Sequence, residues 1–375
     1  MQKPDTIRRR QLANLGFVGL LSPIIRLLPR QIVMIAGNAA WIAPLVATIP
    51  ALFLILFMDW FLKNRLPGEG LGDLFLRGLG NLFGRIALLI FTLWLLFYAG
   101  FTVRNGADRF IATVYPNSLP WSFIVVMLLL SLMAILGRLQ VLARTARVFV
   151  PMLLIAFAMI FAFCIPDMDV KNLMPVSYLD IDDILLAVIP VMNTISVFVY
   201  TGFLSGYTDD KTPLIRTYFK WTVLILIIIS LLVVTALGIF GPELVTRISH
   251  LFLVMIRGIS VTNLLERIEA VVIALWVVTD FILVSTFLFV CIENFHLIFG
   301  IKRDKRTVGP RFSLKNGRWL IWLCFIIVSA VAILIAPSSF SLYWLSDALI
   351  PFTNLIFVFV FLPIVCIIGK LRKKI

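Results

Sequence analysis

Apolar runs long enough to cross a lipid bilayer recur along the chain, separated by short polar segments. A spanning helix needs about 20 mostly apolar residues, and the first half of the chain has such runs at 11–28, 36–61, 80–103, 120–137 and 146–165. The second half has them at 183–206, 217–240, 264–296, 319–336 and 346–369. The pattern predicts an all-α polytopic membrane protein with about ten transmembrane helices and both termini on the same side.

The composition supports lipid as the solvent of this fold. Hydrophobic residues make up 61% of the chain and charged residues only 14%, whereas a soluble domain has about 45–50% and 25%. We therefore expect the 375 residues to form a single transmembrane domain with no soluble domain of its own.

The basic residues indicate the orientation. A net charge of +14 would suggest a nucleic-acid partner in a soluble protein, but here 25 of the 33 Lys and Arg residues fall in the termini and in the loops on the same side as the termini. Only 8, among them Arg26, Arg104 and Arg109, fall on the other side. Short cytoplasmic loops collect positive charge, so the distribution predicts cytoplasmic termini and no nucleic-acid partner.

Two spans at corresponding positions of the two halves are interrupted. The first reads Leu-Leu-Ser-Pro-Ile-Ile-Arg, with Ser22, Pro23 and Arg26, and the sixth places Pro190 before Asn-Thr-Ile-Ser. Paired interruptions of this kind are typical of transporters built from inverted repeats, in which the ligand binds between half-helix ends near the bilayer midplane. We expect two five-helix repeats, about 11–165 and about 183–369.

Few other polar groups lie at membrane depth, where an ionisable side chain is costly unless it is paired or faces water. Asp280, in the eighth span, is either a site for a coupling ion, a proton or a ligand amine, or a structural partner of Arg26 or of a hydroxyl. The expected ligand-binding residues are Ser22, Pro23, Arg26, Tyr98, Asn193, Thr194, Ser196 and Asp280.

The sequence offers few residues that could support catalysis. There are two histidines, and the four cysteines all lie inside apolar stretches without metal-binding spacing. No nucleophile–histidine pair, phosphate-binding loop or metal cluster is evident. We expect no catalytic residues, no metal site, no cofactor and no enzyme activity.

One polar segment between spans has a helical pattern of its own. In residues 242–258 apolar side chains recur at helical spacing beside Arg247, His250 and Arg257. This arrangement predicts a helix that lies on the outer membrane interface rather than crossing the bilayer.

The order of several stretches resembles the spore germination permeases, the B-subunits of endospore nutrient-germinant receptors, in the amino acid-polyamine-organocation superfamily. These stretches are RRRQLANLGFVG followed by LLPRQIVMIAGNAAWIAPLVA, then PNSLPWSFIVVMLLLSLMAILGRLQVLARTARVFVPMLL with NLMPV, and LERIEAVVIALWVVTDFILVSTFLF. The individual motifs are degenerate, so their order along nearly the whole chain carries the resemblance.

The resemblance implies a LeuT-like fold with broken helices 1 and 6 and a location in the spore inner membrane or the cell membrane. It implies an A-type membrane subunit and a C-type lipoprotein as partners, and a small nutrient, most often an amino acid, sensed in a central pocket. The family usually has a Gly-Thr-Gly-like break in the first helix, where this chain has Ser22-Pro23-Ile24. Two alternatives remain open, a proton- or sodium-coupled amino acid transporter and an assembly subunit with a non-functional pocket.

Overall fold

Helices form the described part of this computed structural model, which comprises residues 6–63, 65–66, 68–113, 119–208, 214–248, 250–258, 268–301, 318–335 and 339–372. The first part of the chain forms α1 (Arg9–Ala36), η1 (Gly37–Ile42), α2 (Ala43–Val46), α3 (Thr48–Lys63), α4 (Leu71–Leu79), α5 (Asn81–Thr113), α6 (Pro120–Leu136) and α7 (Leu139–Cys164). Three short 3-10 turns follow, η2 (Ile165–Asp167), η3 (Val170–Leu173) and η4 (Tyr178–Asp180).

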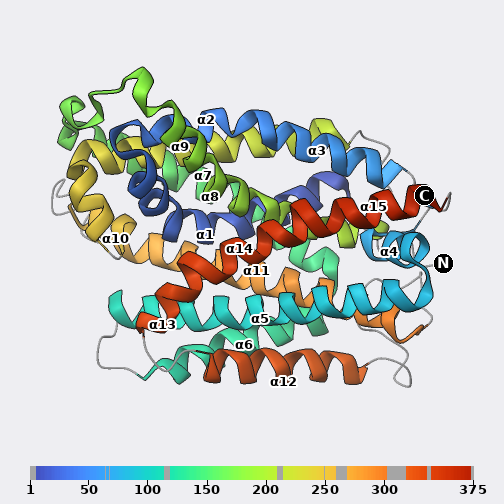
Figure 1. Ribbon diagram of the computed structural model, residues 1–375. Coiled ribbons are helices and arrows are strands. Elements are labelled where there is room, and N and C mark those ends of the chain that lie inside the picture. Colours follow the sequence, from blue (N-terminus) through green and yellow to red (C-terminus); the bar gives the residue numbers. More distant parts are fainter. Residues whose placement is uncertain are drawn as a thin grey trace.

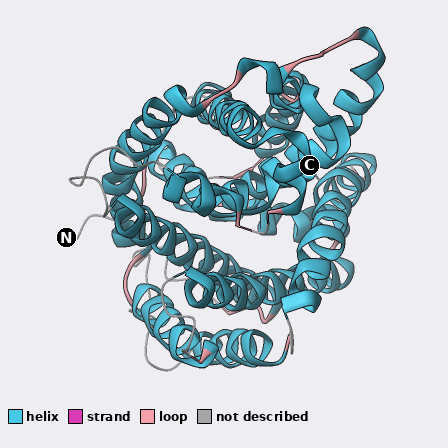
Figure 2. Ribbon diagram, turned by 90° about the vertical axis from the view of Figure 1, so that its left-hand side faces the viewer, coloured by secondary structure: helices cyan, strands magenta, loops and turns pink. Residues whose placement is uncertain are grey.

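The second part forms α8 (Ile181–Ser196), the 3-10 helix η5 (Val197–Tyr207), α9 (Leu214–Arg247), α10 (Leu251–Gly258), α11 (Ile268–Ile298) and α12 (Arg318–Leu334). The last helical stretch consists of α13 (Ser339–Trp344), η6 (Leu345–Leu349), α14 (Ile350–Leu355), η7 (Ile356–Phe361) and α15 (Leu362–Leu371), with η6 and η7 in π-helical geometry. The long helices run side by side along one direction (Figure 1), and Figure 2 shows them nearly end-on.

Within the described residues, seven helical stretches are long and apolar enough to cross a membrane. Two shorter apolar helices, Pro120–Leu136 and Trp319–Leu334, lie at two further predicted spans. Large apolar side chains are exposed on the outer helices, for example Phe53, Met133 and Ile333, as expected where lipid is the solvent. These features fit a multi-pass integral membrane protein, while the count of ten spans and the two inverted repeats stay predictions.

α1 lies at the centre of the bundle, in contact with α7, α8, α9 and α11. Most of its apolar side chains are buried, as a helix surrounded by protein requires, and Met34 and Ile35 near its end are exposed. Gly16 allows a close approach of η5, because a Cβ atom there would lie 2.6 Å from the ring of Phe198. The residues on α1 can therefore meet side chains from several other helices.

The break predicted in the first span is absent. α1 continues as one α-helix through both Pro23 and Pro29, because a proline removes only one hydrogen bond and neighbouring helices can satisfy the freed groups. The sixth span does change geometry, but at Ser196–Val197, where α8 passes into the 3-10 helix η5, rather than at Pro190.

The segment 242–258, predicted as one helix, is divided between two helices, and its place at the membrane interface stays a prediction. α9 continues to Arg247 after a kink at Gly241, whose φ of 69° suits glycine, and α10 is a separate helix. α10 buries most of its apolar side chains, including Leu253 and Met255, and contacts α1, α9 and α11. Packing against these helices accounts for the buried apolar residues of α10.

Backbone and side-chain contacts bring both ends of the described chain to one end of the bundle. The N–H of Ile7 donates to the carbonyl of Tyr207 at 3.0 Å, and Arg65, just before α4, donates to the carbonyl of Ser205. Arg372, after α15, donates to the carbonyl of Leu79 at the end of α4, at 2.7 Å. The cytoplasmic orientation of this end stays a prediction.

Candidate functional site

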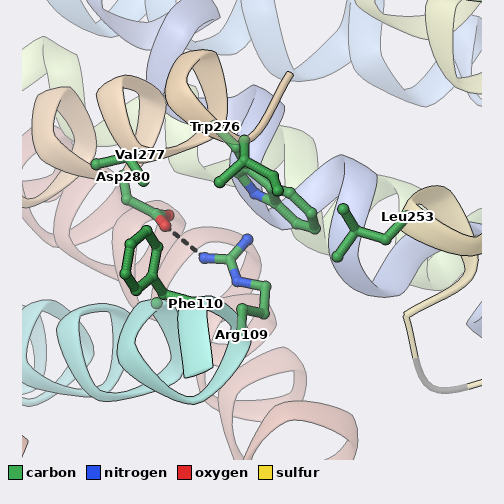
Figure 3. Close-up of a pocket in the computed structure, with 8 residues that line it drawn as sticks. Arg109, Phe110, Leu253, Trp276, Val277 and Asp280 are labelled. Carbon is green, nitrogen blue, oxygen red and sulfur yellow. Dashed lines mark hydrogen bonds and ion pairs between the residues drawn. The ribbon is translucent and has the colours of Figure 1, made fainter. Parts of the chain in front are cut away.

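A buried ion pair joins two long helices inside the bundle. Asp280 of α11 accepts a hydrogen bond from the guanidinium of Arg109 of α5 through Oδ2, and the two residues are 2% and 5% exposed. The hydroxyl of Ser22, on α1, donates to the other carboxylate oxygen, Oδ1. Figure 3 shows Arg109 and Asp280 pointing toward one another from facing helices.

Trp276 forms a second contact with the same guanidinium. It precedes Asp280 by four residues, so both side chains lie on one face of α11. The guanidinium carbon of Arg109 lies 4.1 Å from the centroid of the Trp276 ring, and the indole N–H donates to the Ser22 hydroxyl at 3.3 Å. Gly106, one turn before Arg109, leaves space for the carboxylate, since a Cβ atom there would lie 3.2 Å from Asp280 Oδ2.

The neighbours of Asp280 explain how a carboxylate is tolerated at this depth. A buried charge is stable only when it is paired and its remaining hydrogen-bonding capacity is used. Arg109 supplies the opposite charge and Ser22 occupies the second carboxylate oxygen. Of the two roles considered for Asp280, the structure therefore shows pairing with a hydroxyl and with an arginine, although that arginine is not Arg26.

The cavity beside this pair is small in the present conformation. Its volume is about 20 Å³, enough for about one water molecule. Its lining comes from α5, α10 and α11 and consists of Gly106, Arg109, Phe110, Leu253, Ile273, Trp276, Val277 and Asp280. A nutrient the size of an amino acid would need this space to widen.

Arg26 lies one turn after Ser22 on α1, near the ion pair but not bonded to it. Its guanidinium carbon is 5.2 Å from the centroid of the Phe101 ring on α5. Its buried Nε atom has no hydrogen-bond acceptor within the part of the chain that the structure describes. Arg26 therefore contributes positive charge near the site without a hydrogen bond to Asp280.

Two other predicted residues, Tyr98 and Pro23, lie at different distances from the ion pair. Tyr98 is buried on α5 in contact with the rings of Trp94 and Phe287, and it precedes Arg109 by eleven residues, about 16 Å along a helix. Pro23 is buried next to Ser22 in α1. The structure thus brings Ser22 to Asp280, and it does not bring Tyr98 into the cavity.

The polar residues of the sixth span mostly bond within their own helix. Thr194 donates to the carbonyl of Pro190 at 3.1 Å, and the hydroxyl of Ser196 donates to the carbonyl of Asn193. Asn193 has a buried Oδ1 atom without a hydrogen-bond donor among the described residues. Asn193 is therefore the member of this group whose side-chain oxygen is not already engaged. A ligand role for the predicted residues stays a prediction.

A second buried polar centre lies among aromatic rings. Asn354, on α14 between the two π-helical segments, accepts hydrogen bonds from Tyr200 at 2.6 Å and from Trp94 at 3.2 Å. Phe91 and Phe357 pack beside these donors. These contacts tie α5, η5 and α14 together in the interior of the bundle.

Sequence reasoning placed Arg109 in an outer loop, and this placement was wrong. α5 runs ten residues past the predicted end of the third span, to Thr113, so Arg109 belongs to the helix. The signal was present, because no proline occurs between Leu79 and Pro116 to end that helix. Trp276 was missed as well, although its spacing from Asp280 could have indicated it.

Comparison with solved structures shows a transporter fold. A Na⁺-coupled sialic acid symporter in a substrate-bound, outward-open state aligns with a TM-score of 0.65 at 15% identity, covering 95% of this chain and 80% of the symporter. A mutant manganese transporter from Eremococcus coleocola aligns over 97% of this chain and 96% of that chain at 14% identity, with a TM-score of only 0.38. No curated protein matches the sequence.

The family comparison is more specific than the fold. The model of a family described as spore germination protein matches residues 7–340, which include all of the helices that supply Ser22, Arg109 and Asp280. The match agrees with the resemblance in the sequence, and both family and fold are those of permeases. This chain belongs to the spore germination protein family.

Proposed function

We propose that this protein is a membrane subunit of a spore germinant receptor and that it senses a small zwitterionic nutrient, an amino acid or a related solute, at the Arg109–Asp280 pair. The observation that carries the proposal is this buried ion pair between α5 and α11 in a chain of the spore germination protein family. We place the protein in the spore inner membrane or cell membrane with cytoplasmic termini. Its partners would be an A-type membrane subunit and a C-type lipoprotein.

The chemistry of the pair suits a ligand that carries both charges. A guanidinium binds a carboxylate through two parallel hydrogen bonds, so Arg109 can exchange Asp280 for the carboxylate of the ligand. Asp280 then becomes available to the ligand ammonium group, with the hydroxyl of Ser22 beside it. Each buried charge keeps a partner throughout, which avoids the cost of an isolated charge.

Binding by this route requires a conformational change. The cavity of about 20 Å³ must widen before an amino acid can enter, and α5 and α11 would separate locally when their ion pair is exchanged. A ligand shifts a conformational equilibrium only by its differential affinity for the two states. The ligand-bound state, with the helices further apart, would be the one that the partner subunits recognise.

Thermal stabilisation of the detergent-purified full chain tests the proposed site. We expect an amino acid from a broad panel to raise the melting temperature of the wild type, while its amide and its deaminated analogue do not. A matched variant, Arg30→Gln, alters an arginine outside the cavity and should keep the response, whereas Arg109→Gln should lose it. Equal stabilisation by the charged and neutral analogues would refute recognition by the ion pair.

A germination assay tests the receptor role separately. Spores that lack the gene should fail to germinate with at least one nutrient, and a restored copy carrying Arg30→Gln should respond normally. Normal germination of the deleted strain with every nutrient tested would refute the receptor role. No stabilisation by any compound, together with lost germination, would instead support an assembly subunit whose pocket does not bind nutrients.

A proton- or sodium-coupled amino acid transporter is the second candidate, and the fold shared with a Na⁺-coupled symporter favours it. Asp280 is less suited to a coupling ion than the sequence alone suggests, because Arg109 already neutralises it. An added cation would have to displace the guanidinium. Uptake into proteoliposomes that depends on a proton or sodium gradient would support the transporter, and its absence across a solute panel would contradict it.

A further inference from the structure

A groove opens on the outside of the bundle between α3 and α15. Its volume is about 410 Å³, and it is lined by Phe57, Trp60, Pro363, Cys366, Ile367, Lys370 and Leu371. This volume falls in the range of about 300–1,000 Å³ that is usual for ligand pockets. α3 and α15, drawn blue and red in Figure 1, run toward the same end of the bundle.

The walls of the groove are apolar and face outward. Trp60 is 42% exposed and Ile367 is 59% exposed. Aromatic and aliphatic side chains of the groove are therefore in contact with the surroundings of the bundle. For helices that cross a bilayer this surrounding is lipid, and a recess among aromatic and aliphatic side chains accepts an acyl chain at no polar cost. Among the described residues that line the groove, Lys370 is the one that carries a charge.

The ammonium group of Lys370 places a positive charge at one end of the groove. The Lys370 ammonium lies 5.4 Å from the centroid of the Trp60 ring, which fixes it over the groove by a cation–π contact. Lys63 follows Trp60 by three residues and so lies on the same side of α3, where it pairs with Asp59 at 2.8 Å. Both lysines lie in the last turns of their helices, where we expect the polar boundary of the bilayer.

We propose that this groove binds one anionic phospholipid, with an acyl chain between α3 and α15 and the phosphate on the Lys370 ammonium group. The apolar walls and the charged mouth match the two parts of such a lipid, and the match in charge distinguishes it from a zwitterionic lipid. Basic residues at a membrane surface attract anionic lipids in this way. The site lies apart from the Arg109–Asp280 pair and does not depend on the proposed nutrient.

Native mass spectrometry of the detergent-purified full chain tests the charge. Phosphatidylglycerol and phosphatidylcholine with identical acyl chains are titrated separately, and we expect phosphatidylglycerol to bind several-fold more tightly. Lys370→Gln should weaken phosphatidylglycerol about fivefold, the effect of one lysine at a membrane surface, and leave phosphatidylcholine unchanged. Lys220→Gln, which removes an exposed lysine of α9 outside the groove, should change neither.

A second pair of variants tests the groove itself. Ile367→Trp fills the groove and should weaken the binding of both lipids, whereas Ile333→Trp, at a residue of α12 that is 61% exposed, should not. Equal affinities for the two lipids would overturn the proposal. So would binding that survives Ile367→Trp and is displaced by glycerol phosphate alone, since this result would indicate a headgroup site without an acyl chain.

A partner helix is the competing occupant. If neither lipid binds at the groove, and Ile367→Trp instead releases a membrane subunit that copurifies with the wild type, then the groove is a protein interface and the lipid proposal is wrong. Circular dichroism of each variant, measured well below its melting temperature, shows whether the helices are intact. A loss of binding with an unchanged spectrum does not reflect a loss of helical structure.

Discussion

Replacing Asp280 by Asn removes one charge of the buried ion pair while keeping the shape of the side chain. Arg109 would then retain its charge at 5% exposure without the carboxylate of Asp280. Removing one partner of a buried pair typically costs about 3–5 kcal/mol, because the other charge stays desolvated. We therefore expect Asp280→Asn and Arg109→Gln each to lower the free energy of unfolding by about 3–5 kcal/mol.

The double variant measures the interaction between the two charges apart from the effect of each substitution on other neighbours. Arg109→Gln with Asp280→Asn removes both charges and leaves two amides that can bond to each other, so it should be more stable than either single variant. The coupling free energy follows from the four proteins of the cycle. The measurement is reversible unfolding of the full chain in mixed micelles, followed by circular dichroism as the denaturing detergent is increased.

A second pair in the same protein provides the control. Arg30 and Asp347 lie 4.0 Å apart, and their side chains are 29% and 38% exposed. Arg30 also donates to the carbonyl of Thr246 at 3.0 Å, so Asp347→Asn is the variant that removes the exposed pair without removing this bond. Exposed pairs contribute about 0–1 kcal/mol, and Asp347→Asn should change the free energy of unfolding by no more than that. If Asp280→Asn cost as little as Asp347→Asn, or if the double variant lost the sum of both single losses, the description of a coupled buried pair would be refuted.

Three further predictions concern single contacts. Gly100→Ala should lower the free energy of unfolding by about 1–3 kcal/mol, since its Cβ would lie 2.5 Å from Val331 Cγ1 on α12. Gly258→Ala should not, because no packing atom of the described residues lies within 4 Å of the new Cβ, and equal losses would contradict this packing. Ser22→Ala should cost about 1–3 kcal/mol in the same assay by leaving a buried carboxylate oxygen unsatisfied, and an unchanged stability would contradict the bond. Burial, and then the charge of Arg109, lower the pKa of His250 below 6.5, so the unfolded state binds the proton more readily and stability should fall as the pH drops below about 6.5. His250→Gln should flatten that part of the pH profile, and an unchanged slope would assign it to other groups.

Among the described residues, the seven helical stretches that are long and apolar enough to cross a membrane all overlap predicted spans, because hydropathy detects runs of the length that a bilayer requires. The ends of the helices were not predicted. α5 runs to Thr113, about ten residues past the predicted end of its span at 103, because protein contacts rather than lipid surround its last turns. Polar residues such as Arg104 and Arg109 can stay helical where other helices supply partners, and a hydropathy count cannot register this.

The interruption at Pro23 illustrates the opposite error. A proline in an apolar run predicts a break, yet α1 continues, since the bundle surrounds the helix and supports its backbone. In contrast, the change of geometry in the sixth span follows Ser196, where the sequence has no proline or glycine to indicate it. Such changes depend on contacts between residues far apart in the chain, which a single sequence does not reveal.

Of the two residues of the ion pair, the sequence singled out Asp280 but not Arg109. Asp280 was prominent because a carboxylate in an apolar span is rare and costly, and a hydroxyl was among its expected partners. Its arginine was not identified, because 171 positions separate Arg109 from Asp280 and only the packing of α5 against α11 brings them together. A buried charge indicates that a partner exists without indicating which residue it is.

Stability alone does not explain why the chain keeps this pair. Replacing a buried ion pair by packed apolar residues is often neutral or stabilising by about 1–4 kcal/mol, so a bundle selected only to stay folded could dispense with Arg109 and Asp280. The pair joins a helix of the predicted first repeat to a helix of the predicted second repeat, and Ser22 adds α1 to the same contact. Under the proposed function, a ligand that exchanges the two charges would therefore act on the contact between the halves, which is where a receptor needs its ligand to act.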